Sequence, residues 1–521
     1  MDAAAKPLNP VSDRPRRLPR VSIVQLAVML CLVALAVRAL GLGMRPLWLD
    51  EAYSWWFSAR DLHYLWTVVP TYEPHPPFYY TLLKGWRALA GGSLIGLRSF
   101  SVFCGVATLP VIVAAALELE RQRPSGHAKL TAAVAGLLAA LSPMLELLDQ
   151  EARPYPLLIL AYAVAVLGAL RLLREFKSGP GRWNSWLLLA AGTELAMWAH
   201  GLGLLYAICL AAAVAPAWLA RPFRRDRLVR GAVAASAVAL FYLPCLLMIV
   251  GRSGDWGTGW LSWRPFMLLE LIALYSVPFE LLTIASAVAA LIMLLLIKRA
   301  AVFVWRQQGW SAERALVILW LGPPLLTALI SIAGMPIFLT RTLAGTLIPA
   351  YLLMAAAVAR TSSGPERRLL VAALAITLLP ATIQVALHPA TEDWPAVRTY
   401  LAQHAAPGDQ VWLYPNDSAL PLAAAGPLPA GTRGIPGDYP AIDKRGPIRA
   451  GSPAVVSVTE GQARAYASDP CLADAPTIWL VTRQPGVFDP HGDVTAALAQ
   501  VRKAGPKREW GYIAVQPFTR R

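Results

Sequence analysis

Long apolar segments alternate with short polar connections over the first three quarters of the chain. Several of them, such as 21–42 and 232–250, approach or exceed the roughly 20 apolar residues that a helix needs to cross a bilayer. The pattern predicts an all-α polytopic membrane domain over 21–387. Its eleven predicted spans are 21–43, 98–118, 130–148, 155–173, 184–201, 203–219, 229–250, 279–297, 314–333, 337–359 and 369–387.

Two further segments do not fit a simple span. The segment 75–89 is short and carries Lys84 and Arg87, and counting it as a twelfth span would invert every later connection. We therefore predict a juxtamembrane or re-entrant helix on the outer side. The stretch 265–297 exceeds one span and is interrupted by Pro278, so its first part is expected in the outer interface.

The pattern changes at about His388, where the sequence becomes polar and rich in proline and glycine. Short apolar runs predict strands at 410–414, 454–458, 477–482 and 512–516. Helices are predicted at 394–404 and at 494–502, the second opened by Asp493 as a cap. The range 388–521 is thus predicted to be a small α/β domain, which is long enough to bury its own core. It shows no catalytic constellation, and acceptor binding and structural support are both open.

Composition and charge refine this picture. Of 521 residues, 56% are hydrophobic and 15% charged, and a mean hydropathy of +0.49 excludes an ordinary soluble protein. The net charge of +16 falls in the short connections, so we interpret it as a topology signal and predict no nucleic-acid partner. The five cysteines indicate neither a disulfide framework nor a zinc site.

The distribution of basic residues predicts the orientation. The N-terminal range 1–20 is basic and precedes an apolar run that is too long for a signal peptide and lacks a cleavage site, so it is expected to stay as a cytoplasmic anchor. The eleven spans then put the basic clusters at 121–123, 174–182, 221–230, 298–314 and 367–368 inside. The C-terminal domain falls outside the cytoplasm, with a bacterial inner (plasma) membrane as the natural location.

Three segments then face outward, at 43–98, 149–154 and 251–264, and the first carries adjacent acids among Trp and Tyr residues. Neighbouring residues on a helix diverge by about 100°, so Asp50 and Glu51 cannot both face one reacting atom. We predict that one is a catalytic base, with Asp50 preferred, and that the other is structural. Capping of a short outer helix is the alternative for Asp50, and an interfacial belt is the alternative for the aromatic residues.

The second outward segment places Glu151 and Arg153 between two apolar spans, where charges need partners. Either Arg153 pairs with Glu151 to hold the turn, or Glu151 binds a metal or the acceptor while Arg153 meets a phosphate. Arg341, a few residues into a predicted span, either clamps a lipid phosphate or pairs with Glu194 or an outer acid. His200, at a span end, is more often a polar cap than a ligand.

Four motifs together resemble the GT-C glycosyltransferases, in the branch of protein O-mannosyltransferases and aminoarabinose transferases (family 39). They are Asp50-Glu51 after the first span, the run 75–80 (HPPFYY), the run 150–155 (QEARPY) and the segment 338–349, with 392–394 (EDW) resembling the start of the tail domain.

The resemblance implies a many-helix membrane fold, an active site on the outer face and a polyprenyl-phosphate sugar as donor. It implies Asp50 as base; from the residues themselves, Glu51 and Glu151 are further catalytic candidates, and Arg153 and Arg341 are expected to bind the donor phosphate. His75, Tyr79, Tyr155 and His200 are the expected substrate contacts. Several relatives carry Asp where this chain has Tyr155, so the second acidic role falls to Glu151 or Asp149. A divalent metal (Mg or Mn) at Asp50 and Glu151 is therefore open.

Together these features favour an inverting glycosyltransferase on the outer membrane face, acting on an unidentified glycan, lipid or protein acceptor in contact with membrane lipids. A polytopic transporter or lipid flippase is the main alternative, although such proteins usually show internal repeats and helices broken near the midplane. A non-catalytic scaffold that presents the tail domain is the second alternative. It would leave Asp50, Glu51 and the Glu151 to Arg153 turn without a function.

Overall fold

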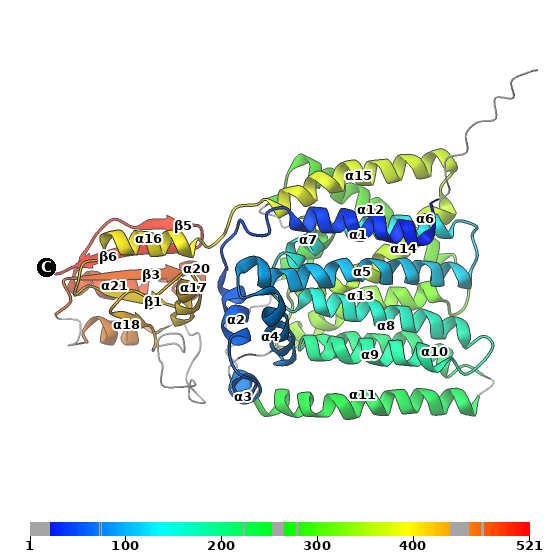
Figure 1. Ribbon diagram of the computed structural model, residues 1–521, viewed down its shortest axis with the longest axis horizontal. Helices are drawn as coiled ribbons and strands as arrows, with labels where there is room; N and C mark the ends of the chain where they lie inside the picture. Colours follow the sequence, from blue (N-terminus) through cyan, green and yellow to red (C-terminus); the bar gives the residue numbers. More distant parts are fainter. Residues whose placement is uncertain are drawn as a thin grey trace, which may run out of the picture.

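The protein consists of a helical bundle and a smaller sheet domain that sits against one end of it, as seen in a computed structural model (Figure 1). The structure describes residues 21–71, 73, 75–221, 224–252, 265–277, 281–437, 458–469 and 474–521. The basic N-terminal range 1–20, most of the predicted outward segment 251–264, Pro278 and most of the predicted strand 454–458 lie outside the described residues.

Every predicted span coincides with a helix or a pair of helices, which confirms the all-α membrane domain. The helices of the bundle are α1 (Ile23–Ala39), α5 (Leu94–Gln122), α6 (Ala128–Ala140), α7 (Pro143–Asp149), α8 (Tyr155–Glu175), α9 (Trp183–Ala199), α10 (Gly203–Trp218), α11 (Arg225–Arg252), α12 (Ile284–Trp305), α13 (Ala312–Ile332), the 3-10 helix η5 (Thr340–Thr346), α14 (Leu347–Thr361) and α15 (Gly364–Ala386).

The length and composition of these helices are those of a multi-pass membrane protein. Among the described residues, seven helices are long and apolar enough to cross a bilayer, and the pair α6 and α7, bent by 54°, forms an eighth candidate. The helices α1 and α10 are apolar but shorter. Ser142 makes the bend between α6 and α7, because it caps the N-terminus of α7 and is followed by Pro143, which α7 tolerates at its first position.

Small residues allow the central helices to approach closely. The most apolar stretch of η5 and α14 is completely buried, and that of α8 is 83% buried. A side chain on Gly168 or Gly192 would lie 2.4 Å from the backbone of Leu189 or 2.5 Å from that of Ala165, so α8 and α9 pack backbone to backbone. Small residues at such interfaces are how helices associate in lipid, where water does not drive them together. These helices form the closely packed centre of the bundle.

Short helices cover the end of the bundle that faces the sheet domain (Figure 1). They are α2 (Leu49–Ser58), α3 (Leu62–Thr67), η1 (Val69–Thr71) and α4 (Phe78–Ala90). The prediction of a short helix near 75–89 is confirmed by α4, which has 13 residues and buries only one face, whereas its place on the outer side stays a prediction. The predicted interruption of 265–297 is also confirmed, because the 3-10 helix η3 (Pro265–Tyr275) precedes α12.

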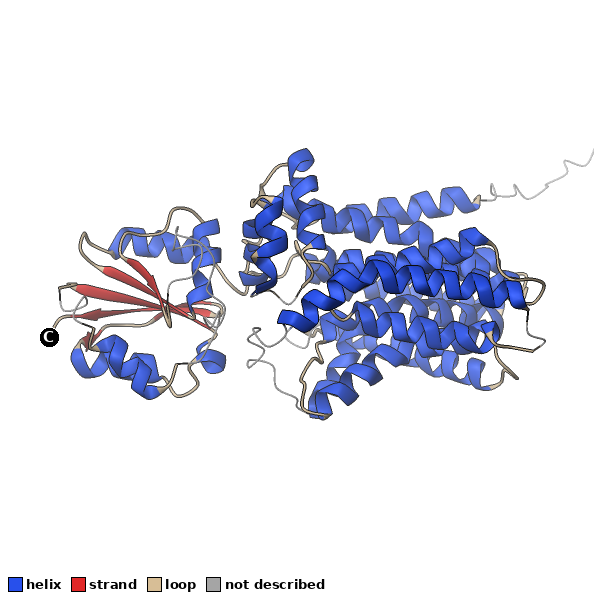
Figure 2. Ribbon diagram, turned by 90° about the horizontal axis from the view of Figure 1, so that it is seen from below, coloured by secondary structure: helices blue, strands red, loops and turns tan. Residues whose placement is uncertain are grey.

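The C-terminal domain contains a six-stranded mixed sheet with helices on both faces (Figure 2). The strand order is β2-β1-β3-β6-β4, with β5 also paired to β6. Strands β2, β1 and β3 are parallel, and β6 is antiparallel to β3. The strands are β1 (Gln410–Tyr414), β2 (Thr432–Gly434), β3 (Thr477–Arg483), β4 (Lys503–Ala504), β5 (Arg508–Trp510) and β6 (Ile513–Thr519).

The predicted helices of this domain are present as α16 (Trp394–His404) and α21 (Asp493–Val501), and α17 (Ala419–Ala424), α18 (Glu460–Ala467) and α20 (Pro485–Phe488) were not predicted. One detail was wrong. Asp493 does not cap α21, because it is the first residue of the helix and Gly492, with φ of 71°, occupies the cap position. Glycine adopts this left-handed backbone without strain.

Candidate active site

Glu51, on the first turn of α2, forms a buried ion pair with Arg98. The guanidinium nitrogens Nε and Nη2 of Arg98 lie 2.8 and 2.6 Å from the two carboxylate oxygens of Glu51, and the backbone N–H of Ala152 donates to Glu51 at 2.9 Å. Arg98 also donates to the carbonyls of Leu42 and Arg45. Both side chains are buried. This bidentate pair joins α2, the start of α5 and the turn before α8, which is what a structural carboxylate does.

Asp50 points elsewhere and meets two other arginines. Its Oδ2 lies 3.3 Å from Nη2 of Arg341 and 3.7 Å from Nη2 of Arg153. Nη1 of Arg153 also donates to the backbone carbonyl of Asp50 at 2.9 Å. The side chain of Asp50 is 20% exposed, so it stays reachable while that of Glu51 is not. The structure thus brings together three residues that the sequence predicted for one site.

The charges around Asp50 keep its carboxylate ionised. Burial raises the pKa of Asp50, but the positive charges of Arg153 and Arg341 outweigh this and leave the pKa below its ordinary value. Within the described residues, Nε of Arg153 and Nε of Arg341 are buried and have no hydrogen-bond partner. Buried donors of this kind are costly to leave unsatisfied. They are therefore suited to an incoming anion.

The rim of the site is aromatic. The Arg341 guanidinium lies 5.5 Å from the centre of a Trp48 ring and 5.9 Å from that of Tyr155. The predicted contact Tyr155 thus lies beside the arginines, as the first residue of α8. Tyr79, by contrast, is completely buried and packs on Tyr80 and Phe100. Its burial favours a packing role over the predicted substrate contact.

The turn between α7 and α8 does not contain the ion pair between Arg153 and Glu151 that was one of the two alternatives from the sequence. Arg153 faces Asp50 and not Glu151, and Asp149 is taken by Arg38, whose Nε lies 2.6 Å from Oδ2. Glu151 is half-buried near Arg341 and Asp50. Burial and the negative charge of Glu51 raise the pKa of Glu151 to about 7, although Arg341 and Arg45 oppose the shift. Glu151 therefore changes charge near neutral pH.

Two predicted histidines meet next to this cluster. Nε2 of His75 lies 3.0 Å from Nε2 of His200, and Nδ1 of His75 lies 2.5 Å from Glu73. Nδ1 of His200 accepts the backbone N–H of Leu202. In a neutral His200 the proton is then on Nε2, which donates to His75, and His75 donates from Nδ1 to Glu73. The result is a hydrogen-bonded chain from α10 to the first outer segment.

The C-terminal domain holds the start of α2 from the other side. Glu392 accepts from the backbone N–H of Leu49 at 3.2 Å and from the Trp394 indole at 2.8 Å. Arg483, at the end of β3, lies 3.5 Å from Glu392 and 3.8 Å from Asp417. These charged side chains are buried. The residue directly before Asp50 is thus fixed by the sheet domain.

Comparison with known proteins identifies the fold. No family model matches the sequence, and no curated protein matches it. ArnT from Cupriavidus metallidurans in the apo state superposes with a TM-score of 0.60 at 14% identity, over 95% of this chain and 98% of that one. The same enzyme bound to undecaprenyl phosphate gives a TM-score of 0.60 at 15% identity, with the same coverage. The chain has the GT-C fold.

A second protein with the GT-C fold also superposes on this chain. The Archaeoglobus fulgidus oligosaccharyltransferase in complex with Zn and sulfate has a TM-score of 0.55 at 13% identity, over 92% of this chain and 71% of that one. AglB from the same organism, with an inhibitory peptide and a dolichol-phosphate, gives 0.56 at 12% identity, over 94% and 74%. These structures confirm the resemblance in fold that the motifs predicted.

The predicted metal is not supported by the residues at this site. In the part of the chain that the structure describes, no group of three or more His, Cys, Asp and Glu side chains is arranged to hold a metal ion. At Asp50 the positive charge comes from Arg153 and Arg341, which already occupy the carboxylate that Mg²⁺ or Mn²⁺ would need. The residues present fit an anion better than a cation.

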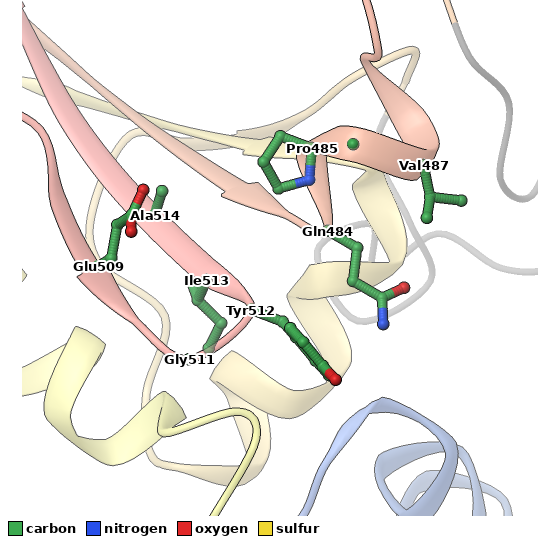
Figure 3. Close-up of a pocket in the computed structure, with 9 residues that line it drawn as sticks. Gln484, Pro485, Val487, Glu509, Gly511, Tyr512, Ile513 and Ala514 are labelled. Atoms are coloured by element: carbon green, nitrogen blue, oxygen red, sulfur yellow. The ribbon is translucent and has the colours of Figure 1, made fainter. Parts of the chain in front are cut away.

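A separate hollow lies on the sheet domain, directly after Arg483. It measures about 400 Å³ and is lined by residues that follow β3, by Glu509 of β5, and by residues just before and at the start of β6. Gln484, with φ of 44°, and Tyr512 both project at this end of the sheet (Figure 3). In sheets with parallel strands, ligands often bind at the carboxyl ends of the strands. None of its lining residues is Asp50, Arg153 or Arg341.

Proposed function

We propose that this chain is a glycosyltransferase that moves a sugar from a polyprenyl-phosphate donor to a hydroxyl acceptor on the outer face of the membrane. The observation that carries the proposal is the Asp50 cluster, in which a reachable carboxylate lies within 3.3 and 3.7 Å of two arginines. Support also comes from the GT-C fold, whose members ArnT and AglB have been solved with undecaprenyl phosphate and a dolichol-phosphate.

Asp50 acts as the general base in this proposal. The acceptor hydroxyl gives its proton to the Asp50 carboxylate while its oxygen attacks the anomeric carbon. The bond between that carbon and the phosphate oxygen breaks, and its electron pair leaves with the polyprenyl phosphate. A single displacement of this kind inverts the anomeric centre.

Arg153 and Arg341 stabilise the leaving phosphate. Each has an Nε donor without a partner among the described residues, in addition to the nitrogen that faces Asp50. Fixed donors aimed at developing charge are usually the largest single contribution to catalysis. When a phosphate binds these guanidiniums, its negative charge also raises the pKa of Asp50 from its depressed value, because like charge disfavours ionisation. Donor binding thus makes Asp50 a better base.

Trp48 and Tyr155 flank the arginines and are suited to the sugar and the first isoprene units. The chain of Glu73, His75 and His200 closes another side of the site. We assign this hydrogen-bonded chain to substrate positioning, because the backbone N–H of Leu202 fixes which ring nitrogens of the two histidines carry protons. Glu51 is assigned a structural role through Arg98.

The test is release of polyprenyl phosphate from a panel of polyprenyl-phosphate sugars by purified protein in nanodiscs. We expect Asp50→Asn to lower turnover by about 10²–10⁴-fold, the usual contribution of a general base. Asp61→Asn is the matched control, because Asp61 lies on the same outer loop and only caps α3, which Asn does equally well. Full turnover in a folded Asp50→Asn protein would exclude Asp50 as the base.

A further inference from the structure

A second cavity, of about 390 Å³, opens at the end of the bundle opposite to Asp50. Helix α5 joins the two ends, since Arg98 near its start binds Glu51 and Gln122 at its end lines the cavity. The 24 residues between them span roughly 36 Å at about 1.5 Å per residue, which exceeds the roughly 30 Å of a bilayer's hydrocarbon core. The cavity therefore opens at the other membrane surface.

Cations from three separate connections converge on this cavity. Arg123 follows α5, Lys177 follows α8, and Arg221 and Arg224 lie between α10 and α11; Arg227, on the first turn of α11, joins them. Glu313 is the single carboxylate among its described lining residues, and it is buried. The lining therefore carries a clear excess of positive charge.

Three other arginines at this end of the bundle form ion pairs within the protein. Arg121 and Arg174 both pair with Glu118, and Arg360 pairs with Glu120 at 3.0 Å. In contrast, no carboxylate in the described ranges forms an ion pair with Arg123, Lys177 or Arg224. Arg224 donates to the backbone carbonyl of Ser178 at 3.0 Å, which leaves its charge uncompensated. A topology signal alone does not require such a gathering around one hollow.

The cavity also has apolar lining residues. Leu173, Phe176 and Pro216 line it, together with Trp310, which is 39% exposed. Helix α13 begins beside Trp310, and its first residues, Ala312 and Glu313, also line the cavity. A helix N-terminus adds partial positive charge. The cavity thus combines cations with apolar residues, which suits an amphipathic anion.

We propose that this cavity binds a phosphate-bearing group, most simply the headgroup of an anionic phospholipid from that leaflet. The volume is within the range of small-molecule sites. The cations face the phosphate, while Phe176 and Trp310 contact the glycerol and the first acyl carbons. The shared chemistry is the phosphate, so a soluble phosphate compound is the second source, and the test separates the two.

The test measures binding of fluorescent phosphatidylglycerol, and separately phosphatidylcholine, to the full-length protein in mixed micelles. We expect phosphatidylglycerol to bind more tightly, and Arg123→Gln with Arg224→Gln to weaken it roughly 25-fold, since each cation that faces the phosphate contributes about fivefold. Arg121→Gln and Arg225→Gln are matched controls, because Arg121 is paired and neither lines the cavity. Both controls should keep phosphatidylglycerol affinity within about twofold.

Inorganic phosphate identifies the source. Competition by millimolar phosphate that is lost in the Arg123→Gln, Arg224→Gln protein would support the site and assign it to a soluble phosphate compound. No competition, with preserved phosphatidylglycerol binding, would support the lipid. Equal affinity for both lipids, or equal weakening in the control variants, would overturn the proposal.

Discussion

Asp50 and Glu51 are neighbours on α2, yet they occupy opposite kinds of environment. Glu51 is completely buried and bound in a bidentate pair to Arg98, with oxygen to nitrogen distances of 2.6 and 2.8 Å. Asp50 is partly exposed and has longer contacts, of 3.3 and 3.7 Å, to Arg341 and Arg153. The first carboxylate has its partners satisfied, whereas the second shares arginines that still have unpartnered donors.

The difference shows how two adjacent positions on one helix can have a structural and a chemical role. A buried carboxylate with complete hydrogen bonding is expensive to disturb and has little reason to move a proton. A reachable carboxylate lies between two guanidiniums that still have unpartnered N–H donors. A ligand can therefore bind these donors and replace the carboxylate as their partner. The predictions below test this contrast from the largest expected effect to the smallest.

After Asp50 itself, the two arginines that face it should have the largest effect. Arg341→Gln, or Arg153→Gln, is expected to lower kcat by about 10²–10³-fold, the cost of removing one donor aimed at developing charge. The measurement is steady-state release of polyprenyl phosphate. Arg341→Lys should recover only part of the loss, because lysine does not reproduce the planar guanidinium. Full recovery by lysine would mean that charge alone matters.

Glu51 should affect folding more than chemistry. Glu51→Gln leaves Arg98 buried without its counter-charge, and we expect a loss of about 3–5 kcal/mol of stability. The check is the thermal unfolding midpoint in detergent, compared with Asp50→Asn. The double variant Glu51→Leu, Arg98→Leu should recover much of the stability, because removing both charges avoids an unpaired one. Equal midpoints for Glu51→Gln and Asp50→Asn would contradict the contrast.

The C-terminal domain should act on Asp50 through α2. Glu392→Gln weakens the acceptor for the Leu49 N–H and the pairing with Arg483. We expect kcat to fall by about tenfold, in line with a loss of about 1.4 kcal/mol in positioning, while KM for the donor changes little. Glu509→Gln is the control, since Glu509 is exposed on β5. A change in KM with unaltered kcat would argue for acceptor or donor binding instead.

Glu151 should give the smallest effect, seen as pH dependence. Its pKa is raised to about 7 by burial and by Glu51, so it is neutral below that pH and negative above it. Negative charge near Arg341 opposes binding of the donor phosphate. KM should therefore rise a few-fold between about pH 6 and 8 in the wild type. In Glu151→Gln this rise should be absent, as followed by donor KM across the same range.

The sequence predicted much of the fold because lipid imposes simple rules. Apolar length yielded helices at all eleven predicted spans. The two-residue β4 and three-residue β2 and β5 were missed, since such short strands lack a periodic pattern. The docking of the tail domain on α2 was missed as well, because it depends on pairs such as Leu49 with Glu392, 343 residues apart.

The site was partly predictable for the same reason. Adjacent acids in an outer loop and an arginine inside a span are unusual, so Asp50 and Arg341 were found although 291 positions separate them. The partner of Glu51 was not found. The available signal was Arg98 itself, a charge at the first residue of a predicted span, which needs a buried partner. Glu73 could have been noticed from its position two residues before His75.

The central claim is that Asp50 moves the proton while the arginines hold the phosphate, and one paired measurement separates these roles. Polyprenyl phosphate affinity and sugar turnover would both be measured for the wild type and for Asp50→Asn in nanodiscs. The account predicts that Asp50→Asn loses turnover but binds polyprenyl phosphate at least as tightly as the wild type, because Arg153 and Arg341 no longer share a carboxylate. Retained turnover in the folded variant would contradict the account.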